Sequence, residues 1–190
     1  TIKRSEDPLI DNQLKEELSS SEKNIDENLM IVDVLRNDIS RVSKKGSVEV
    51  TELAKIKSYK NVHHLVSTIK GLLAEKLDAI DLLFATLPGG SITGAPKIRA
   101  MEIISELEKN RRGVYCGAIG FISLSKDSDF NIPIRTLTIA DNTISINCGG
   151  GIVSDSNAES EYQESIDKIE NILRENRKKI IKQSSNVNQK

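Results

Sequence analysis

Tryptophan is absent from the 190 residues, and aromatic residues make up only 3% of them. Proteins that hold single-stranded nucleic acid stack its bases on aromatic side chains, so the composition argues against this class. An excess of positive charge is also lacking, because 27 Lys and Arg stand against 28 Asp and Glu. Proteins that bind nucleic-acid phosphates need a basic surface, and we therefore expect no nucleic-acid partner.

No run of residues approaches the ~20 apolar positions that a membrane helix needs, so no membrane partner is expected. No basic start followed by an apolar run predicts a signal peptide. The two cysteines, Cys116 and Cys148, are too few for a disulfide framework in a chain of this length. A reduced, cytoplasmic protein is the expectation.

The hydrophobic content of 37% and charged content of 29% suit a soluble globular domain with a modest core. The chain begins at Thr1 without an initiator methionine, which predicts processing or excision from a longer protein. We expect one folded region over residues 1–182, followed by a polar, disordered tail over 183–190.

Hydrophobic periodicity predicts the order of the elements. The expected helices cover residues 11–41 with a break at 19–21, 78–87, 96–109 and 158–182, the last with Tyr162, Ile166, Ile169 and Leu173 facing inward. The expected strands cover 47–50, 62–69, 114–124, 132–140 and 143–148, with a two-residue turn at Asp141-Asn142. This order favours an α+β fold with a largely antiparallel sheet and packed helices.

Three glutamates are candidate ligands of a cation. Glu161 and Glu164 are three residues apart and therefore share one face of the last helix, behind a cap region at 154–157. Glu27 lies among apolar residues of the first helical segment. Carboxylates in such surroundings need hydrogen bonds, ion pairs or a cation, and a few carboxylates suit Mg²⁺. Solvated glutamates on helix surfaces remain the alternative.

Other residues are candidates for anion binding and proton transfer. Gly89-Gly90-Ser91 before a helix and Gly149-Gly150-Gly151 after a strand can offer backbone N–H groups to a carboxylate or phosphate, or can form tight turns. Arg135, in an otherwise apolar strand, can bind a carboxylate with two donors or form an internal ion pair. His64 can act as an acid or base, or be structural.

Five motifs, in order along nearly the whole chain, resemble those of the chorismate-utilising enzymes. They are DENLMIVDVLRND at 26–38, PGGSITGAPKIRAM at 88–101, YCGAIGF at 115–121, IRTL at 134–137 and GGGIVSD at 149–155. The GGSITG form of the second motif and the His63-His64 doublet are most similar to the aminodeoxychorismate synthase component I branch of that family.

The resemblance implies chorismate as substrate, bound Mg²⁺ and a glutamine amidotransferase partner that supplies ammonia. It implies that Glu27 and Glu164 bind the metal directly and Glu161 through water. It further implies that Tyr115, Arg135 and the backbone of Gly149-Gly150-Gly151 hold the substrate carboxylates, and that His64 and the Ser91 hydroxyl lie near the reacting ring.

Two departures from the family pattern stand out. Asn24 occupies a position where the family usually carries an acid, and the family's nucleophilic lysine and proton donor would lie upstream of Thr1. The chain therefore resembles the C-terminal part of such an enzyme, which we expect to be inactive alone and to self-associate. Anthranilate synthase component I, or a non-catalytic module that only binds or docks, are the alternatives.

Overall fold

A computed structural model describes residues 1–141, 143–154 and 156–187 of the chain. The side chains of Asn171, Leu173 and residues 175–187 are outside that description. Four expectations fall wholly or partly there: the turn residue Asn142, the cap and motif residue Asp155, the inward side chain of Leu173, and the tail from residue 188.

The described chain divides into two units. The first comprises Thr1–Arg111 with Phe121–Asp129, and the second comprises Arg112–Gly120 with Phe130–Lys190. The mixture of helices with antiparallel strands confirms the predicted α+β class.

The first unit is built on a sheet of three strands in the order β1-β3-β2. Strand β1 (Ile2–Lys3) and strand β2 (Glu49–Ser58) both pair antiparallel with β3 (Val62–Lys70). The predicted strand at 47–50 was too short because a bulge lies between Glu52 and Lys55, and Ala54 has a φ of 47°. Burial alternates along β2, but Leu53 falls on the exposed side and Glu52 on the half-buried side, which hides the apolar period of two by which a strand is recognised.

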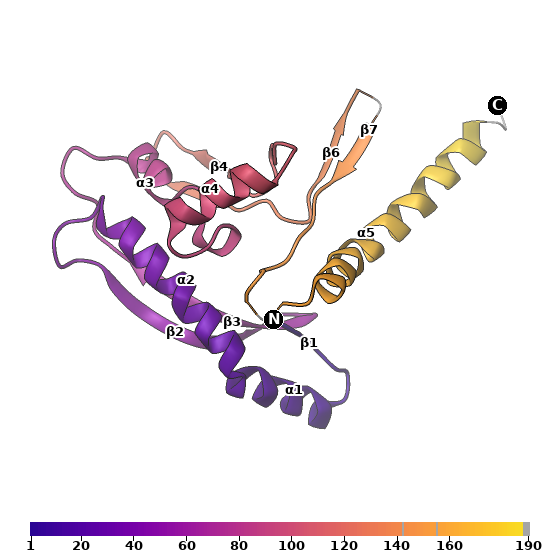
Figure 1. The fold of residues 1–190 in the computed structure, drawn as a ribbon, viewed down its shortest axis with the longest axis horizontal. Coiled ribbons are helices and arrows are strands. Elements are labelled where there is room, and N and C mark those ends of the chain that lie inside the picture. The colour runs from indigo at the N-terminus through magenta and orange to yellow at the C-terminus, as the bar shows by residue number, and fades with distance from the viewer. Residues whose placement is uncertain (142, 155, 188–190) are drawn as a thin grey trace. The chain divides into compact units, whose positions relative to one another are not determined.

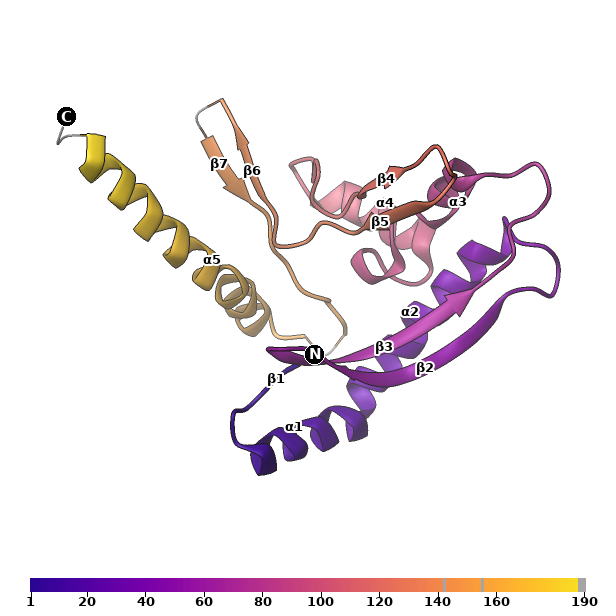
Figure 2. The same ribbon diagram turned by 180° about the vertical axis from the view of Figure 1, so that it is seen from behind.

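Two helices cover one face of this sheet, and serine separates them. Helices α1 (Pro8–Ser20) and α2 (Glu22–Ser40) confirm the predicted break, because Ser21 accepts a hydrogen bond from the N–H of Asn24 as the N-cap of α2. Helix α2 crosses the face of β2 and β3, in front of the sheet in Figure 1 and behind it in Figure 2. Val32 of α2 is buried, and Leu35 and Ile39 on the same stripe are half-buried.

The first unit ends in helix α3 (Ala79–Thr86), the short 3₁₀ turn η1 (Gly90–Ile92) and helix α4 (Lys97–Leu107). Asp78 caps α3 and accepts hydrogen bonds from the N–H groups of Ile80 and Asp81. Pro96 stands at the N-cap of α4, one residue before the expected helix position. Strand β4 (Ile119–Ile122) pairs with β5 (Ser128–Asn131), a strand that the sequence did not predict.

The second unit holds the ribbon of β6 (Leu137–Ala140) and β7 (Thr143–Ile146) and the long helix α5 (Ala158–Val187). The antiparallel pair Ala140 and Thr143 confirms the predicted two-residue hairpin connection. Helix α5 extends five residues beyond its expected end at Lys182. Tyr162 and Ile166 were wrongly expected to face inward: they are 64% and 38% exposed. The preceding glycine loop approaches the face of Glu161 and Lys168 instead.

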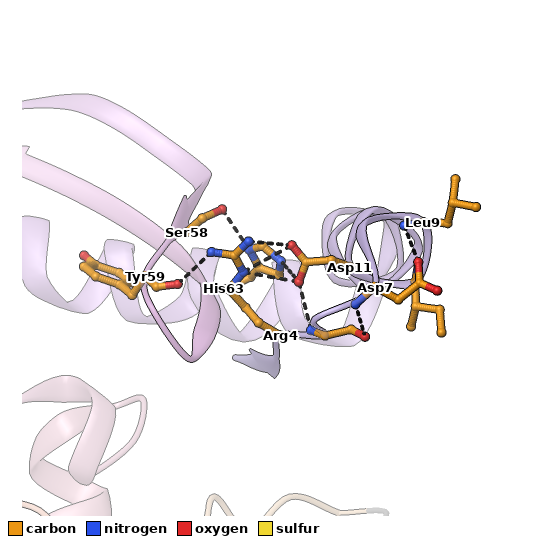
Figure 3. Close-up of polar contacts among 9 residues, drawn as sticks. Arg4, Asp7, Leu9, Asp11, Ser58, Tyr59 and His63 are labelled. Carbon is orange, nitrogen blue, oxygen red and sulfur yellow. Dashed lines mark hydrogen bonds and ion pairs between the residues drawn. The ribbon is translucent and has the colours of Figure 1, made fainter.

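A buried carboxylate joins the first helix to the sheet (Figure 3). Asp11 of α1 accepts two hydrogen bonds from Arg4, at 2.7 Å from Nη2 and 3.1 Å from Nε, and a third from the N–H of Ser5 at 3.0 Å. On the sheet side, Nε2 of His63 lies 3.1 Å from Oδ1 of Asp11, while Nδ1 lies 2.8 Å from the Ser58 hydroxyl. An ionised carboxylate only accepts hydrogen bonds, so Nε2 of His63 carries the donated proton.

We predict that Asp11→Asn lowers the melting temperature at neutral pH and flattens its fall in acid. The hydrogen bonds from Arg4 hold the pKa of Asp11 well below its ordinary value. A depressed carboxyl pKa gives stability that is complete above the unfolded pKa of about 3.9 and is lost as the pH falls towards the folded pKa. Circular dichroism melts between pH 7 and pH 2 measure this loss.

Glu16→Gln, an exposed carboxylate of the same helix, is the matched control and should melt like the parent protein. Identical acid-side curves for Asp11→Asn and the parent protein would show that this carboxylate does not couple folding to pH.

Candidate functional site

Two glycines bring the chain after β7 against the first turns of α5. A Cβ built on Gly150 would stand 3.2 Å from Oε2 of Glu161, 3.8 Å from Oε1 of Glu164 and 3.5 Å from Nζ of Lys168. The backbone therefore lies beside three charged side chains, and a Cβ at position 150 would crowd the Glu161 carboxylate while standing at contact distance from the other two. The two glutamates that the sequence singled out thus converge on one point beside the glycine motif.

Hydrogen bonds and an ion pair at the start of α5 position these charged side chains. Asn157 accepts a hydrogen bond from the N–H of Ser160, which confirms a cap within the predicted region. Glu161 is half-buried and accepts a hydrogen bond of 2.7 Å from the Ser156 hydroxyl. Glu164 is exposed and pairs with Lys168 at 2.5 Å. Glu161 is thus held in place by its neighbours, and Glu164 keeps its charge partly balanced by an ammonium group.

Lys168 is a residue that the sequence reasoning missed. Its ammonium group donates to the carbonyl of Gly149 at 3.2 Å as well as pairing with Glu164. The signal was present, because Glu164 and Lys168 are four residues apart and such pairs meet on a helix face. Lys168 places the one cation of this cluster next to the glycine backbone.

Tyr115 borders the same loop. Its hydroxyl lies 3.2 Å from the point where a Cβ on Gly149 would stand, so a side chain at position 149 would crowd this hydroxyl. Burial, followed by the neighbouring Cys116, raises the pKa of Tyr115 to about 12. The phenol is protonated near neutral pH, as an ordinary tyrosine is, and can donate a hydrogen bond. The guanidinium carbon of Arg112 lies 6.0 Å from its ring centre.

Arg135 does not lie in a strand, contrary to the expectation from its apolar neighbours. It occupies a bend between β5 and β6 with a φ of 51°, and its side chain is exposed. Pro133 explains the difference, because a proline interrupts a run of strand residues. Pro133 is buried, and its carbonyl accepts a hydrogen bond from the N–H of Cys116 at 2.9 Å. Gly151, the third glycine of the motif, is exposed.

The remaining candidates, Glu27, His64 and Ser91, belong to the first unit. Glu27 is an exposed residue of α2, not one enclosed by its apolar neighbours, and Ser91 is exposed in η1. His64 is half-buried on β3, with Nδ1 3.3 Å from the Thr1 hydroxyl and its ring edge-on to Tyr59. His63 faces the opposite side and is buried, as strand alternation predicts.

Asn24, the departure from the family pattern, has a local task. Its side-chain amide donates to the Ser21 hydroxyl at 2.8 Å, next to the N-cap hydrogen bond of α2. An amide at this position thus fastens the start of the helix that carries Glu27.

Within residues 1–141, 143–154 and 156–187, no three His, Cys, Asp or Glu side chains gather in a group that would hold a metal ion by themselves. Glu161 and Glu164 nevertheless fit a hard cation, because both offer carboxylate oxygens around the space that Gly150 leaves open. In the same described part of the chain, every helix is too short or too polar to span a membrane.

Comparison with known proteins extends these observations. Residues 1–174 match the family model described as chorismate binding enzyme. The chain is 53% identical to aminodeoxychorismate synthase component 1 of Salmonella typhimurium over 91% of its own length and 38% of that protein. It is 46% identical to anthranilate synthase component 1 of Aquifex aeolicus over 92% of its length and 35% of that protein.

Solved structures agree in fold. Anthranilate synthase component I of Streptococcus pneumoniae matches with a TM-score of 0.80 and 44% identity, over 88% of this chain and 40% of that one. The menaquinone-specific isochorismate synthase of Escherichia coli matches with a TM-score of 0.80 and 27% identity, over 90% of this chain and 39% of that one. The chain thus spans well under half of the relatives it matches, and it belongs to the family of chorismate binding enzymes.

Proposed function

We propose that this chain provides the carboxylate-binding and metal-binding part of an aminodeoxychorismate synthase component I. The observation that carries the proposal is the convergence of Gly149-Gly150, Tyr115 and the charged face of α5. The proposed reaction replaces the ring hydroxyl of chorismate with an amino group and gives 4-amino-4-deoxychorismate for folate synthesis. The greater identity to aminodeoxychorismate synthases than to anthranilate synthases supports this product.

Chorismate carries two carboxylates, and the proposed anchors are suited to them. Backbone N–H groups of the glycine motif, the Tyr115 hydroxyl and the Arg135 guanidinium are hydrogen-bond donors that can each pair with a carboxylate oxygen. Tyr115 can serve as a donor because a phenol carries its proton at neutral pH. Lys168 adds a positive charge beside the Gly149 carbonyl.

Mg²⁺ is the cation that we propose here, with Glu164 as a direct ligand and Glu161 as a ligand through water. Glu27 stays a proposed direct ligand on the resemblance to the family alone. When bound, the cation neutralises a substrate carboxylate and so assists departure of the ring hydroxyl. The hydrogen bond from Ser156 to Glu161 favours a fixed carboxylate, which suits the strict geometry that Mg²⁺ requires.

His64 and Ser91 are proposed to act near the ring, His64 as an acid or base for the departing or entering group. Ammonia would come from a glutamine amidotransferase partner, and the attacking lysine from outside residues 1–190. We place the reaction in the cytoplasm, and the two free thiols of Cys116 and Cys148 are consistent with a reducing compartment.

Anthranilate synthase remains the second candidate, because a solved relative of that activity matches over 88% of the chain. Product analysis separates the two. The protein that carries this chain, supplied with chorismate, Mg²⁺ and ammonium, should form 4-amino-4-deoxychorismate, whereas accumulation of anthranilate would overturn the proposed product.

We predict that Glu164→Gln weakens Mg²⁺-dependent chorismate binding by about tenfold or more, on the scale of losses at metal sites. The substitution keeps the shape of the side chain but removes one of few anionic ligands. Calorimetric titration of chorismate at increasing Mg²⁺ concentrations measures the effect. Glu170→Gln, an exposed glutamate of the same helix, is the control and should bind as the parent does. Equal Mg²⁺ dependence in both variants would remove Glu164 from the metal site.

We also predict that Arg135→Lys reduces chorismate affinity by ~2 kcal/mol, about the scale of a hydrogen bond to a charged group. Lysine keeps the charge but loses the planar pair of donors that fits a carboxylate. The dissociation constant for chorismate is the measurement. Arg111→Lys, at an exposed position away from the glycine motif in sequence, should leave it unchanged. A parent-like dissociation constant in Arg135→Lys would mean that Arg135 has no part in anchoring the substrate.

Residues 1–190 by themselves should bind chorismate yet consume none of it, with or without ammonium. Binding groups without the attacking group hold a substrate but hardly accelerate its reaction. We further expect a concentration-dependent mass, because large apolar side chains such as Phe84, Ile98 and Leu107 are 77%, 74% and 73% exposed. Chorismate turnover and sedimentation velocity test both statements, and a fully active monomer would contradict them.

A further inference from the structure

A second buried aspartate, outside the residues assigned so far, lies where three helices of the first unit meet. Asp38 of α2 is 3% exposed and forms an ion pair with Nζ of Lys97, the first residue of α4. The side chain of Lys97 is itself only 14% exposed. Arg41 adds a second, longer pair, at 3.8 Å from Asp38. A buried ion pair of this kind is retained at a cost in desolvation, so a role beyond simple stability has to be sought.

The same two cationic side chains, Lys97 and Arg41, also bind backbone carbonyls at the C-terminal end of α3. Lys97 donates to the carbonyl of Thr86 at 3.2 Å, and Arg41 donates to the carbonyl of Ala85 at 2.5 Å. Carbonyls in the last turn of a helix have no partner within the helix, and positive charge is favourable there. Lys97 therefore joins the last residue of α3 to the first residue of α4. Residues 87–96, the segment between them, are held at both ends.

The middle of that segment is fixed by the same helix. A Cβ on Gly90 would stand 2.8 Å from Cγ1 of Val34, so only glycine permits this approach. Val34 and Asp38 are four residues apart and thus share one face of α2. Inside the segment, Thr93 donates its hydroxyl to the carbonyl of Gly89 at 2.9 Å. One face of α2 thus touches the segment in its middle and at its end.

We propose that the Asp38–Lys97 ion pair is a brace that positions the segment 87–96, and with it Ser91, for the substrate. Lys97 is then a positioning residue, acting through the loop and not by contact with the ring. The functional part of this inference rests on the proposed function, because Ser91 is assigned to the substrate there. The structural part, that the pair sets the loop, stands on the contacts alone.

Hydrogen exchange of the amides of residues 89–94, measured without chorismate, tests the structural part. Lys97→Met leaves the Asp38 carboxylate buried without its main partner and should speed exchange by about tenfold or more, the factor for 1.4 kcal/mol of easier opening. Lys97→Arg keeps the cation and should restore most of the protection. Arg99→Met, which removes an exposed cation of the same helix, is the control and should exchange like the parent.

A double variant separates positioning from stability. Asp38→Leu with Lys97→Met replaces both charges by apolar groups, and such replacements often keep or raise stability. We expect its melting temperature to return towards that of the parent while loop exchange stays fast. Parent-like exchange in a stable double variant would overturn the brace. Gly90→Ala, which leaves the ion pair intact but displaces the loop from Val34, should also speed exchange; slow exchange there would count equally against it.

Activity completes the test in the protein that carries this chain. With the brace lost but the fold kept, the double variant should show kcat lowered by about tenfold or more and the KM for chorismate changed by less, because the misplaced group acts in the transition state. A parent-like kcat would overturn the positioning role. If the parent protein binds no chorismate, the proposed function fails, while the exchange data still decide on the brace.

Discussion

The buried carboxylate of Asp11 is the constraint on which the first unit depends. A charge 8% exposed is tolerated only with partners, and it collects Arg4, the Ser5 amide and His63 around itself. Arg4 and Ser5 come from the segment between β1 and α1, and His63 comes from β3 (Figure 3). Because Asp11 fixes His63 on one face of β3, it also decides that His64 points to the other face. The candidate acid or base is therefore placed by a residue with no chemical role of its own.

Asp38 of α2 repeats this device. Each aspartate lies on a helix, each is buried, and each pairs with a cation outside its own helix, Arg4 before α1 for Asp11 and Lys97 of α4 for Asp38. Hydrophobic burial cannot supply this organisation, since the buried apolar side chains of the described residues are few: Leu18, Val32, Val42, Ala85 and Cys116. Directional ion pairs specify where a loop or strand lies, whereas a small apolar core only specifies that the segments collapse.

Sequence reasoning predicted the helices well because capping and period act locally. Ser21 and Asp78 cap helices that begin where periodicity placed them, and the glycine after β7 stands where a backbone must approach closely. Sequence reasoning failed where contacts with other segments determine the local structure. The bulge at Glu52–Lys55 and the bend at Arg135 depend on pairing and on Pro133, and the inward face of α5 depends on what covers it. Lys168 was missed because the spacing of Glu164 and Lys168 indicates only an ion pair on a helix surface. The contact of Lys168 with the Gly149 carbonyl depends on where the glycine loop lies.

The glycine loop of the second unit explains why the charge at the candidate site must be balanced. Glu161 and Glu164 lie within 4 Å of one point beside Gly150, and two carboxylates that close together repel each other and any anionic substrate. Lys168 offsets part of that charge through Glu164, and Glu161 accepts a hydrogen bond from the neutral Ser156 hydroxyl. A divalent cation would supply the remaining balance and turn a surface that rejects a dianion into one that attracts it. In the proposed function, this electrostatic requirement, more than any single motif, would join the glutamates, the glycines and a dicarboxylate substrate in one site.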